Sequence, residues 1–187
     1  MLIYSIIIPV KNMYSSSTQI IVNNNLSSTV KIRYNKYSIN STIFPKNIIS
    51  QLIGHLLGDG SIIFSKTSIN PYFVFTQTAK RSIYTWHIFT TLSHYCFRFP
   101  KYYYTSRNFK YVPFFQVFTR SYPFLKEIYS LFYIKIEGKS VKIIKDDLLK
   151  YLDKIALAYW AMDDGSPSGK NGFYLHTEGF NFEESYK

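Results

Sequence analysis

LIGHLLGDG at residues 52–60 and LAYWAMDDG at residues 157–165 are two versions of one pattern in this chain. Each is an apolar stretch that runs into aspartate and then glycine. Apolar residues around the first copy recur at the helical period, so we predict a helix that ends in an acid. The C-terminal end of a helix is its negative pole, where a carboxylate costs about 0.3–1 kcal/mol. Asp59 and Asp164 therefore indicate chemistry, most simply the binding of a divalent cation.

Small residues in the first copy predict that its helix packs closely against another helix. Asp59 before Gly60 would, alone, also fit an ordinary helix stop with an exposed carboxylate, but the second copy argues against that interpretation. Gly54 and Gly58 are four residues apart and so share one helix face, which lets a second helix approach closely. The stretch is too short to cross a bilayer.

Composition favours a polyanionic partner. The 187 residues carry 22 Lys and Arg against 11 Asp and Glu, a formal net charge of +11, which suits nucleic acid first and an anionic membrane surface second. The single cysteine, Cys96, excludes an intrachain disulfide and a cysteine-based zinc site. Ile, Tyr, Lys, Phe and Asn are abundant, and all have AT-rich codons. We therefore expect an organelle-encoded protein, mitochondrial first and chloroplast second.

The rest of the chain divides into a polar leader and a folded region. Runs of Ser and Asn predict that residues 1–46 are a flexible polar leader with one strand at 19–22. Asn47 is the expected N-cap of the first helix. Between the two acids the patterns predict helix, two strands, helix, two strands and helix. The predicted segments are strands 61–64 and 72–78, helix 80–97, strands 101–105 and 112–118, helix 122–132, a basic turn at 135–144, helices 146–152 and 154–163, strand 172–176 and a helix starting near 181.

Two acid-tipped helices about a hundred residues apart in a basic chain resemble the LAGLIDADG family of homing endonucleases and intron maturases. The resemblance covers residues 47–187 and is closest to the two-motif proteins of organelle introns. It implies an α+β fold in which an αββαββα unit forms an antiparallel DNA-binding saddle. It also implies that the two motif helices pack against each other, with Gly54 and Gly58 facing Ala158 and Ala161. Residues 47–153 would be the first repeat, and residues 154–187 the start of a second repeat that is incomplete, as in a C-terminally truncated chain.

The resemblance also implies a mechanism and its residues. The activity would be hydrolysis of both strands of a long, asymmetric DNA target in the presence of Mg²⁺, which prefers hard oxygen ligands. Asp59 and Asp164 would supply carboxylates to the metal, and the backbone carbonyls of Gly58 and Asp163 would assist. Gln77 matches the polar residue that positions water in the family. Lys139 is the expected basic residue near the cleft, with Lys142 nearly as suitable.

Other residues are assigned by position. The candidate DNA-binding residues lie on or beside the predicted strands, where some would contact phosphate only: Lys66, Lys80, Lys101, Arg107 and Lys110. His55 is interpreted as a packed or interface histidine rather than a catalytic base. Asp163 is expected at the surface or at a junction.

Two functions follow from this reading. The first is an intron-encoded homing endonuclease whose activity truncation would impair, a monomer with pseudo-twofold halves if complete. The alternative is a maturase that binds intron RNA and assists splicing, and the two retained acids favour the nuclease.

Overall fold

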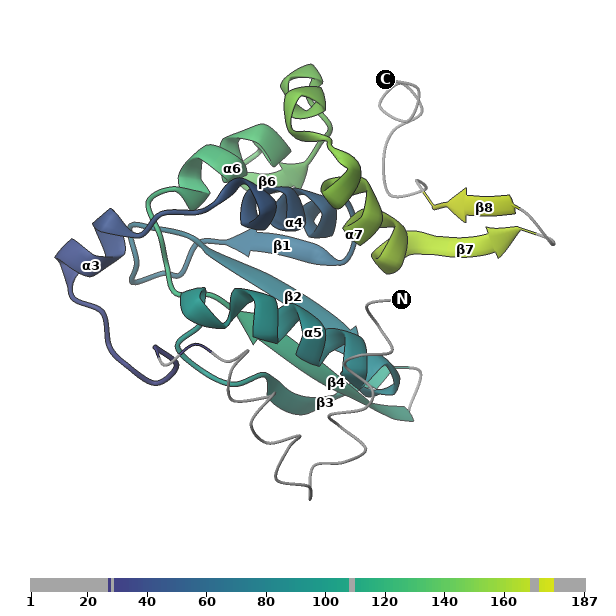
Figure 1. The fold of residues 1–187 in the computed structure, drawn as a ribbon, viewed down its shortest axis with the longest axis horizontal. Coiled ribbons are helices and arrows are strands. Elements are labelled where there is room, and N and C mark those ends of the chain that lie inside the picture. Colours follow the sequence, from purple (N-terminus) through teal and green to yellow (C-terminus); the bar gives the residue numbers. More distant parts are fainter. Residues whose placement is uncertain (1–26, 28, 108–109, 169–171, 177–187) are drawn as a thin grey trace. The chain divides into compact units, whose positions relative to one another are not determined.

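The structure is a computed structural model that describes residues 27, 29–107, 110–168 and 172–176. The first seven elements of the folded region follow the predicted order, helix–strand–strand twice and then a helix (Figure 1). They are α4 (Lys46–Leu57), β1 (Gly60–Ile63), β2 (Tyr72–Thr78), α5 (Ser82–Leu92), β3 (Lys101–Arg107), β4 (Lys110–Phe118) and α6 (Leu125–Phe132). The α+β class and the αββαββα unit are therefore confirmed.

The other elements flank this unit in the chain. Helix α3 (Lys36–Ser41) precedes it, and a hairpin of β5 (Tyr133–Ile136) and β6 (Lys139–Lys142) follows it. A 3₁₀ helix, η3 (Asp146–Tyr151), then leads into α7 (Lys154–Asp164), β7 (Gly165–Ser168) and β8 (Gly172–Leu175). Two short 3₁₀ helices, η1 (Ala79–Arg81) and η2 (Ser93–Tyr95), flank α5.

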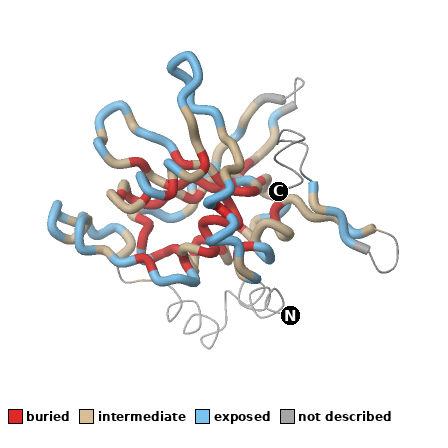
Figure 2. Tube along the Cα trace, turned by 90° about the horizontal axis from the view of Figure 1, so that it is seen from above, coloured by how far each residue is buried: buried red, intermediate tan, exposed pale blue. Residues whose placement is uncertain are grey.

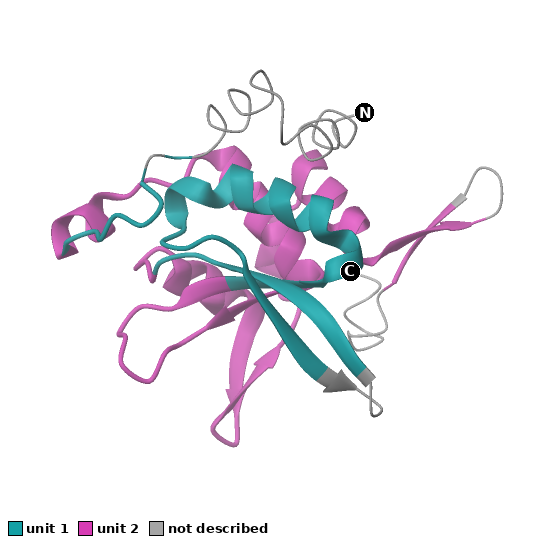
Figure 3. Cartoon of the chain, turned by 90° about the horizontal axis from the view of Figure 1, so that it is seen from below, with its two compact units in different colours: residues 1–35, 74–120 teal, residues 36–73, 121–187 magenta. Residues whose placement is uncertain are grey.

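The chain divides into two compact units, coloured separately in Figure 3. Unit 1 comprises residues 1–35 and 74–120, and unit 2 comprises residues 36–73 and 121–187. The strand order of the main sheet is β1-β2-β4-β3. The chain passes from unit 2 to unit 1 within β2, whose first two residues, Tyr72 and Phe73, belong to unit 2 together with β1.

Unit 1 is an antiparallel sheet packed against α5. Strand β4 lies between β2 and β3, with Gln116 opposite Thr76 on one side and opposite Lys101 on the other. Phe75 and Phe89 are fully buried between the sheet and the helix. Burying a large apolar side chain of this kind stabilises the fold by roughly 1.5–3 kcal/mol, so this layer is the core of the unit.

Unit 2 is centred on α4, in which nine of twelve residues are buried. Figure 2 shows buried backbone concentrated in the interior, and α4 lies beside α7 in Figure 1. Ser50 Oγ lies 2.8 Å from Asp153 Oδ2 near the start of both helices, and His55 Nδ1 lies 2.9 Å from Asp163 Oδ2 near their ends. Contacts that advance in the same direction along both helices show that α4 and α7 pack in parallel.

Two glycines permit this close approach. A Cβ at Gly54 would lie 2.3 Å from the carbonyl oxygen of Ala156 and 2.7 Å from the Cβ of Tyr159. A Cβ at Gly58 would lie 2.5 Å from the Cβ of Asp163. The predicted role of the glycines in packing is therefore confirmed. The predicted partners differ from these, because the nearest atoms belong to Ala156, Tyr159 and Asp163, which lie one or two positions from Ala158 or Ala161, and Ala158 is exposed.

Several predicted boundaries differ from the structure. The first helix begins at Lys46 after Pro45, so Asn47 is not its N-cap. Helix α5 ends at Leu92, before the predicted 97, because the chain tightens there into a 3₁₀ turn. Helix α6 begins at Leu125, three residues after the predicted start. The predicted strand at 19–22 and the helix starting near 181 lie outside the described residues.

The largest difference is the β5–β6 hairpin, which the sequence predicted as a basic turn. Glu137 and Gly138 both have positive φ, 50° and 78°, which matches a two-residue turn whose backbone twist suits flanking strands. Each strand is only four residues long, too short for the alternation of apolar residues to stand out among the lysines. Strand β7 was missed as well.

Helix α3 was also not predicted, since it falls within residues 1–46. In unit 1 the Arg120 guanidinium donates to the carbonyl oxygens of Thr29 and Ile32 at 2.6 and 2.9 Å. It also lies 4.0 Å from the ring centroid of Tyr34. Part of the predicted leader therefore makes specific contacts, while the domain boundary at 46 stays a prediction. Among the described helices, none has the length and apolar character that crossing a bilayer requires.

Replacing Gly54 with Ala is expected to destabilise the protein. An exposed helical glycine gains about 0.5–1 kcal/mol on this change. Here the new methyl group would instead meet backbone oxygen, and overpacking costs about 1–3 kcal/mol. Chemical denaturation measures the free energy of unfolding. Ala158→Ser, at an exposed site of α7, is the control and should change it by less than about 0.5 kcal/mol. A stabilised Gly54→Ala variant would contradict the packing described here.

Candidate active site

The two motif aspartates lie at the C-terminal ends of the paired helices. Asp59 comes two residues after the end of α4 and is exposed, and Asp164 is the last residue of α7 and is partly buried. Both carboxylates act electrostatically on one ammonium group, that of Lys142. The parallel packing of the helices therefore brings together two acids that are far apart in the sequence.

Lys142 is placed by the β5–β6 hairpin. It is the last residue of β6 and pairs across the hairpin with Tyr133. The Tyr133 hydroxyl accepts a hydrogen bond of 3.1 Å from the backbone N–H of Ile62 in β1, and its ring stacks on Tyr129 at 4.6 Å. These contacts hold the hairpin against the strand that follows the first motif.

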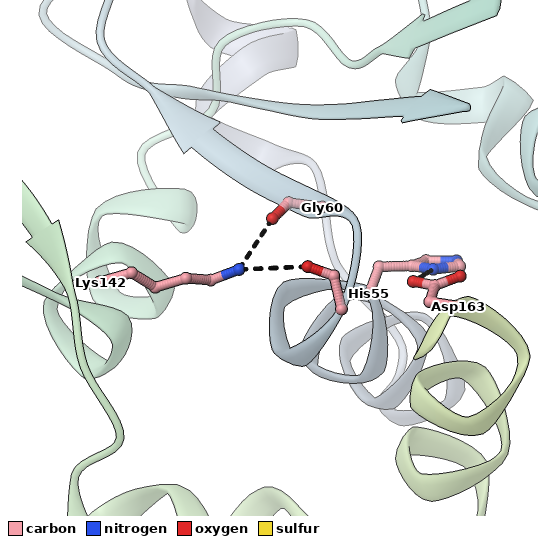
Figure 4. Close-up of polar contacts among 5 residues, drawn as sticks. His55, Gly60, Lys142 and Asp163 are labelled. Carbon is pink, nitrogen blue, oxygen red and sulfur yellow. Dashed lines mark hydrogen bonds and ion pairs between the residues drawn. The ribbon is translucent and has the colours of Figure 1, made fainter. Parts of the chain in front are cut away.

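The Lys142 ammonium binds the backbone on both sides of Asp59. Its Nζ donates to the carbonyl oxygens of Gly58 at 3.4 Å and of Gly60 at 3.1 Å (Figure 4). Burial lowers the pKa of Lys142 to about 8, while the nearby carboxylates of Asp164, Asp59 and Asp163 oppose that shift. The lysine therefore brings a buried positive charge to a cluster of three acids.

Asp163 and His55 form a second polar contact between the helices. His55 Nδ1 lies 2.9 Å from Asp163 Oδ2, and both side chains are fully buried (Figure 4). A carboxylate only accepts hydrogen bonds, so Nδ1 donates when Asp163 is ionised. The His55 ring also packs against Tyr159 at 4.8 Å and Phe73 at 6.1 Å.

These contacts confirm one interpretation of the motif and correct another. His55 is a packed interface histidine, as predicted. Of the two positions expected for Asp163, the surface is wrong and the junction is right, because its side chain is buried in the space that the absent Cβ of Gly58 leaves open between the helices. The sequence held a signal for this contact: the seventh motif position is Gly58 in the first copy and Asp163 in the second. It was missed because only the carbonyl of Asp163 was considered.

The remaining predicted catalytic residues are in different settings. Gln77 belongs to unit 1, where it is buried in β2 and its Oε1 accepts a 2.9 Å hydrogen bond from the backbone N–H of Thr78. Lys139 is exposed at the first position of β6. Of the two lysines considered from the sequence, Lys142 is the one whose ammonium contacts the backbone beside Asp59. The catalytic roles of Gln77 and Lys139 stay predictions.

The predicted DNA-binding residues are distributed over both units. Lys66, in the segment between β1 and β2, belongs to unit 2, while Lys80 in η1 and Lys101 in β3 belong to unit 1; all three are exposed. Arg107 and Lys110 are opposite each other at the ends of β3 and β4. Their role in DNA binding is not tested by these positions.

One sheet face of unit 1 carries a polar row that the sequence did not single out. Thr76, Gln116 and Lys101 are successive partners across β2, β4 and β3, so their side chains emerge on the same face. The Gln116 Nε2 donates to Thr76 Oγ1 at 3.1 Å. These three residues lie in a row because of the register of the strands, which the sequence does not reveal.

Comparison with known proteins identifies the family. A model of the LAGLIDADG DNA endonuclease family matches residues 49–187, which include every element from β1 to β8 and all but the first three residues of α4. The chain belongs to the LAGLIDADG DNA endonuclease family. Asp59 and Asp164 are the acids at the C-terminal ends of its two motif helices.

Relatives of this LAGLIDADG protein include a maturase and a probable endonuclease. It is 32% identical over 158 residues to the cytochrome b mRNA maturase bI2 of Saccharomyces cerevisiae, a match that covers 80% of this chain and 37% of the maturase. It is 33% identical over 142 residues to the Probable intron-encoded endonuclease 1 of Wickerhamomyces canadensis, covering 71% of this chain and 58% of that protein. The chain thus spans less than two thirds of either relative.

A solved structure shares the fold. The homing endonuclease I-WcaI, bound to its DNA recognition sequence, superposes with a TM-score of 0.65 at 30% identity. The match covers 78% of this chain and 65% of that one. The chain therefore has the LAGLIDADG homing endonuclease fold.

LAGLIDADG endonucleases are generally metal-dependent, and the oxygen atoms at the two helix ends suit a hard cation. Asp59 and Asp164 carry carboxylates, and the Gly58 carbonyl keeps a second lone pair beside its contact with Lys142. Among the described residues, no three His, Cys, Asp or Glu side chains form a metal-binding cluster. The fit thus rests on two carboxylates and backbone carbonyls.

The pKa of Lys142 predicts how stability depends on pH. Its ordinary pKa of 10.5 falls to about 8 in the folded chain, so between these values the unfolded chain binds more protons. Stability then rises with pH, at no more than about 1.4 kcal/mol per pH unit. The free energy of unfolding of the wild type, relative to Lys142→Met, should therefore increase between pH 8 and pH 10.5.

Chemical denaturation in buffers that contain EDTA, at a series of pH values, measures this difference in the free energy of unfolding. The control is Lys139→Met, which removes an exposed lysine of the same strand. The difference in the free energy of unfolding between wild type and this control should not change with pH. Parallel pH curves for wild type and Lys142→Met would show that the ammonium is not buried.

Proposed function

We propose that this chain is an intron-encoded homing endonuclease that makes a sequence-specific double-strand break in DNA by metal-dependent hydrolysis. The observation that carries the proposal is the parallel pairing of α4 and α7, whose neighbouring C-terminal ends carry Asp59 and Asp164. A protein that only bound nucleic acid would need no acids at this position. The similarity to a probable intron-encoded endonuclease and to a homing endonuclease supports the same function.

Mg²⁺ is the proposed cofactor. Asp59 and Asp164 would hold it, with the carbonyls of Gly58 and Asp163 as further ligands. When bound, the metal would lower the pKa of a water molecule and stabilise charge on the phosphate. The protein residues would bind, orient and balance charge around it.

Lys142 takes the basic role that was predicted for Lys139. Its ammonium fixes the backbone on both sides of Asp59 and offsets the repulsion between three carboxylates and a DNA phosphate. Gln77 is retained as the residue that positions water. Its buried side chain has few accessible conformations, which would favour such a role.

The proposed partner is double-stranded DNA with a long asymmetric target site. The net charge of +11 favours attraction to phosphate. The row of Thr76, Gln116 and Lys101 offers hydroxyl, amide and ammonium groups, which suit base edges in the major groove. Lys66, Lys80, Arg107 and Lys110 are the other proposed DNA contacts. A monomer with two pseudo-symmetric halves remains the proposed form of the whole protein.

Mitochondrial encoding is proposed as the origin. Two independent observations support it: the excess of residues with AT-rich codons, and a relative named for cytochrome b mRNA. Sequencing the DNA that flanks the reading frame tests this origin.

Maturase function is the second candidate, because a relative with that name matches 80% of this chain. Binding assays with the intronless DNA target and with the intron RNA separate the two candidates. Tight RNA binding with no cleavage of DNA would favour the maturase.

Asp59→Asn and Asp164→Asn should each abolish cleavage of target DNA in Mg²⁺ while retaining binding. Asparagine keeps the shape but loses the charge that holds a cation, and losses of at least about a hundredfold are expected for removing such an interaction. Gel assays of cleavage and of binding measure the two effects separately. Asp147→Asn, at an exposed carboxylate paired with Lys150, is the matched control. Unimpaired cleavage by Asp164→Asn would contradict the role of the second acid.

Lys101→Gln should weaken DNA binding and reduce its salt dependence. If Lys101 contacts phosphate, the slope of log K against log salt falls by about one unit for all sequences. If it contacts a base, the loss is about 1–3 kcal/mol and only at one position of the target. Lys154→Gln, at an exposed lysine of α7, is the comparison. Equal effects of both substitutions would argue against a specific role for the polar row.

A further inference from the structure

We infer that His55 and Asp163 are positioning residues that hold the acid-bearing end of α7 against α4, and so place Asp164. The pair does not touch the reacting atoms in this reading. It acts through the backbone, because Asp163 directly precedes Asp164 in the chain. The consequence for DNA cleavage rests on the proposed function, whereas the positioning of the helix end does not.

The first observation is the burial of the contact. Both side chains are inaccessible to solvent, and their atoms lie 2.9 Å apart. Removing one partner of such a pair leaves a polar group buried alone, which is strongly unfavourable. The last turn of α7 can therefore move away from α4 only if this contact breaks.

The second observation is the space that Gly58 provides. Any side chain there would begin 2.5 Å from the Cβ of Asp163 and 2.9 Å from its Oδ2. The fourth position of the first motif is His55, which supplies a donor, and the seventh is Gly58, which leaves a space without a side chain. The carboxylate of Asp163 in the second motif contacts the donor and occupies the space. This fit couples the first motif to the second and would not arise between two copies of either.

The third observation is that the two acids are held differently. Lys142 binds the carbonyls of Gly58 and Gly60, on either side of Asp59. Asp163 instead ties the turn before Asp164 to the neighbouring helix. Loss of the His55–Asp163 contact should therefore disturb Asp164 more than Asp59.

The chain offers a matched control at the other end of the same helices. Ser50 Oγ lies 2.8 Å from Asp153 Oδ2, where Asp153 caps the start of α7. Ser50→Ala removes this inter-helix contact far along the helix from the acids. A loss of stability alone should look the same for both contacts, whereas a positioning role should not.

The variants are His55→Leu, the double variant His55→Leu with Asp163→Leu, His55→Asn and Ser50→Ala. Replacing both partners of a buried pair with apolar residues is often neutral for stability, so the double variant keeps the fold while losing the contact. Asparagine can place a donor near the position of Nδ1 and should rescue. Each variant is studied as the full chain.

Hydrogen exchange measured by mass spectrometry gives the first readout. The double variant should speed exchange of the backbone amides at residues 161–165 by about tenfold, while residues 155–158 stay protected. Ser50→Ala should speed exchange at residues 155–158 and leave residues 161–165 protected. His55→Asn should resemble wild type. Equal acceleration along α7 in the double variant would overturn the inference.

Strand-resolved cleavage of the target gives the second readout. The double variant should slow cutting of one strand about tenfold more than the other, so nicked DNA accumulates. Ser50→Ala should slow both strands alike or neither. Equal slowing of both strands by the double variant, without rescue by His55→Asn, would refute the role in catalysis. A wild-type chain that cuts neither strand would refute the proposed function, and the exchange data would still decide the positioning.

Discussion

The close packing of α4 on α7 is the constraint on which the rest of unit 2 depends. Backbone of one helix approaches the other because Gly54 and Gly58 have no Cβ, and a methyl group at either would meet atoms closer than van der Waals contact allows. Parallel packing then makes the two helix ends neighbours. The carboxylates and the buried histidine take their positions from that geometry, and the lysine that the β5–β6 hairpin places contacts the backbone beside Asp59.

Duplicated motifs need not create equivalent sites. The two copies share their acids, yet the seventh position is a gap in one and a buried carboxylate in the other. Lys142 contacts the backbone carbonyls of Gly58 and Gly60 on either side of Asp59, whereas Asp164 follows Asp163, whose carboxylate contacts His55. Asymmetry of this kind suits a single chain that faces an asymmetric target, where each half of the site has its own strand.

Electrostatics explains why a lysine is buried beside the acids. Three carboxylates near one helix pair would repel each other and a DNA phosphate, and a nearby positive charge reduces that repulsion. Burial disfavours the charged ammonium and lowers its pKa to about 8, and the same carboxylates restore part of the loss. The charge balance of the site is therefore local and is separate from the net charge of +11, which acts at longer range.

The sequence by itself determined the acid-tipped helices, the αββαββα order and the family, because hydrophobic period, small-residue spacing and the Asp-Gly ends are local patterns. It placed β2 at residues 72–78 without error. It did not reveal the β5–β6 hairpin, the partner of Gly58 or the contact of Lys142 with the backbone beside Asp59. Only the tertiary structure decided these, because each depends on which residues of distant segments meet. His55 and Asp163 are 108 positions apart, and no local pattern in either segment specifies that one will fill the space beside the other.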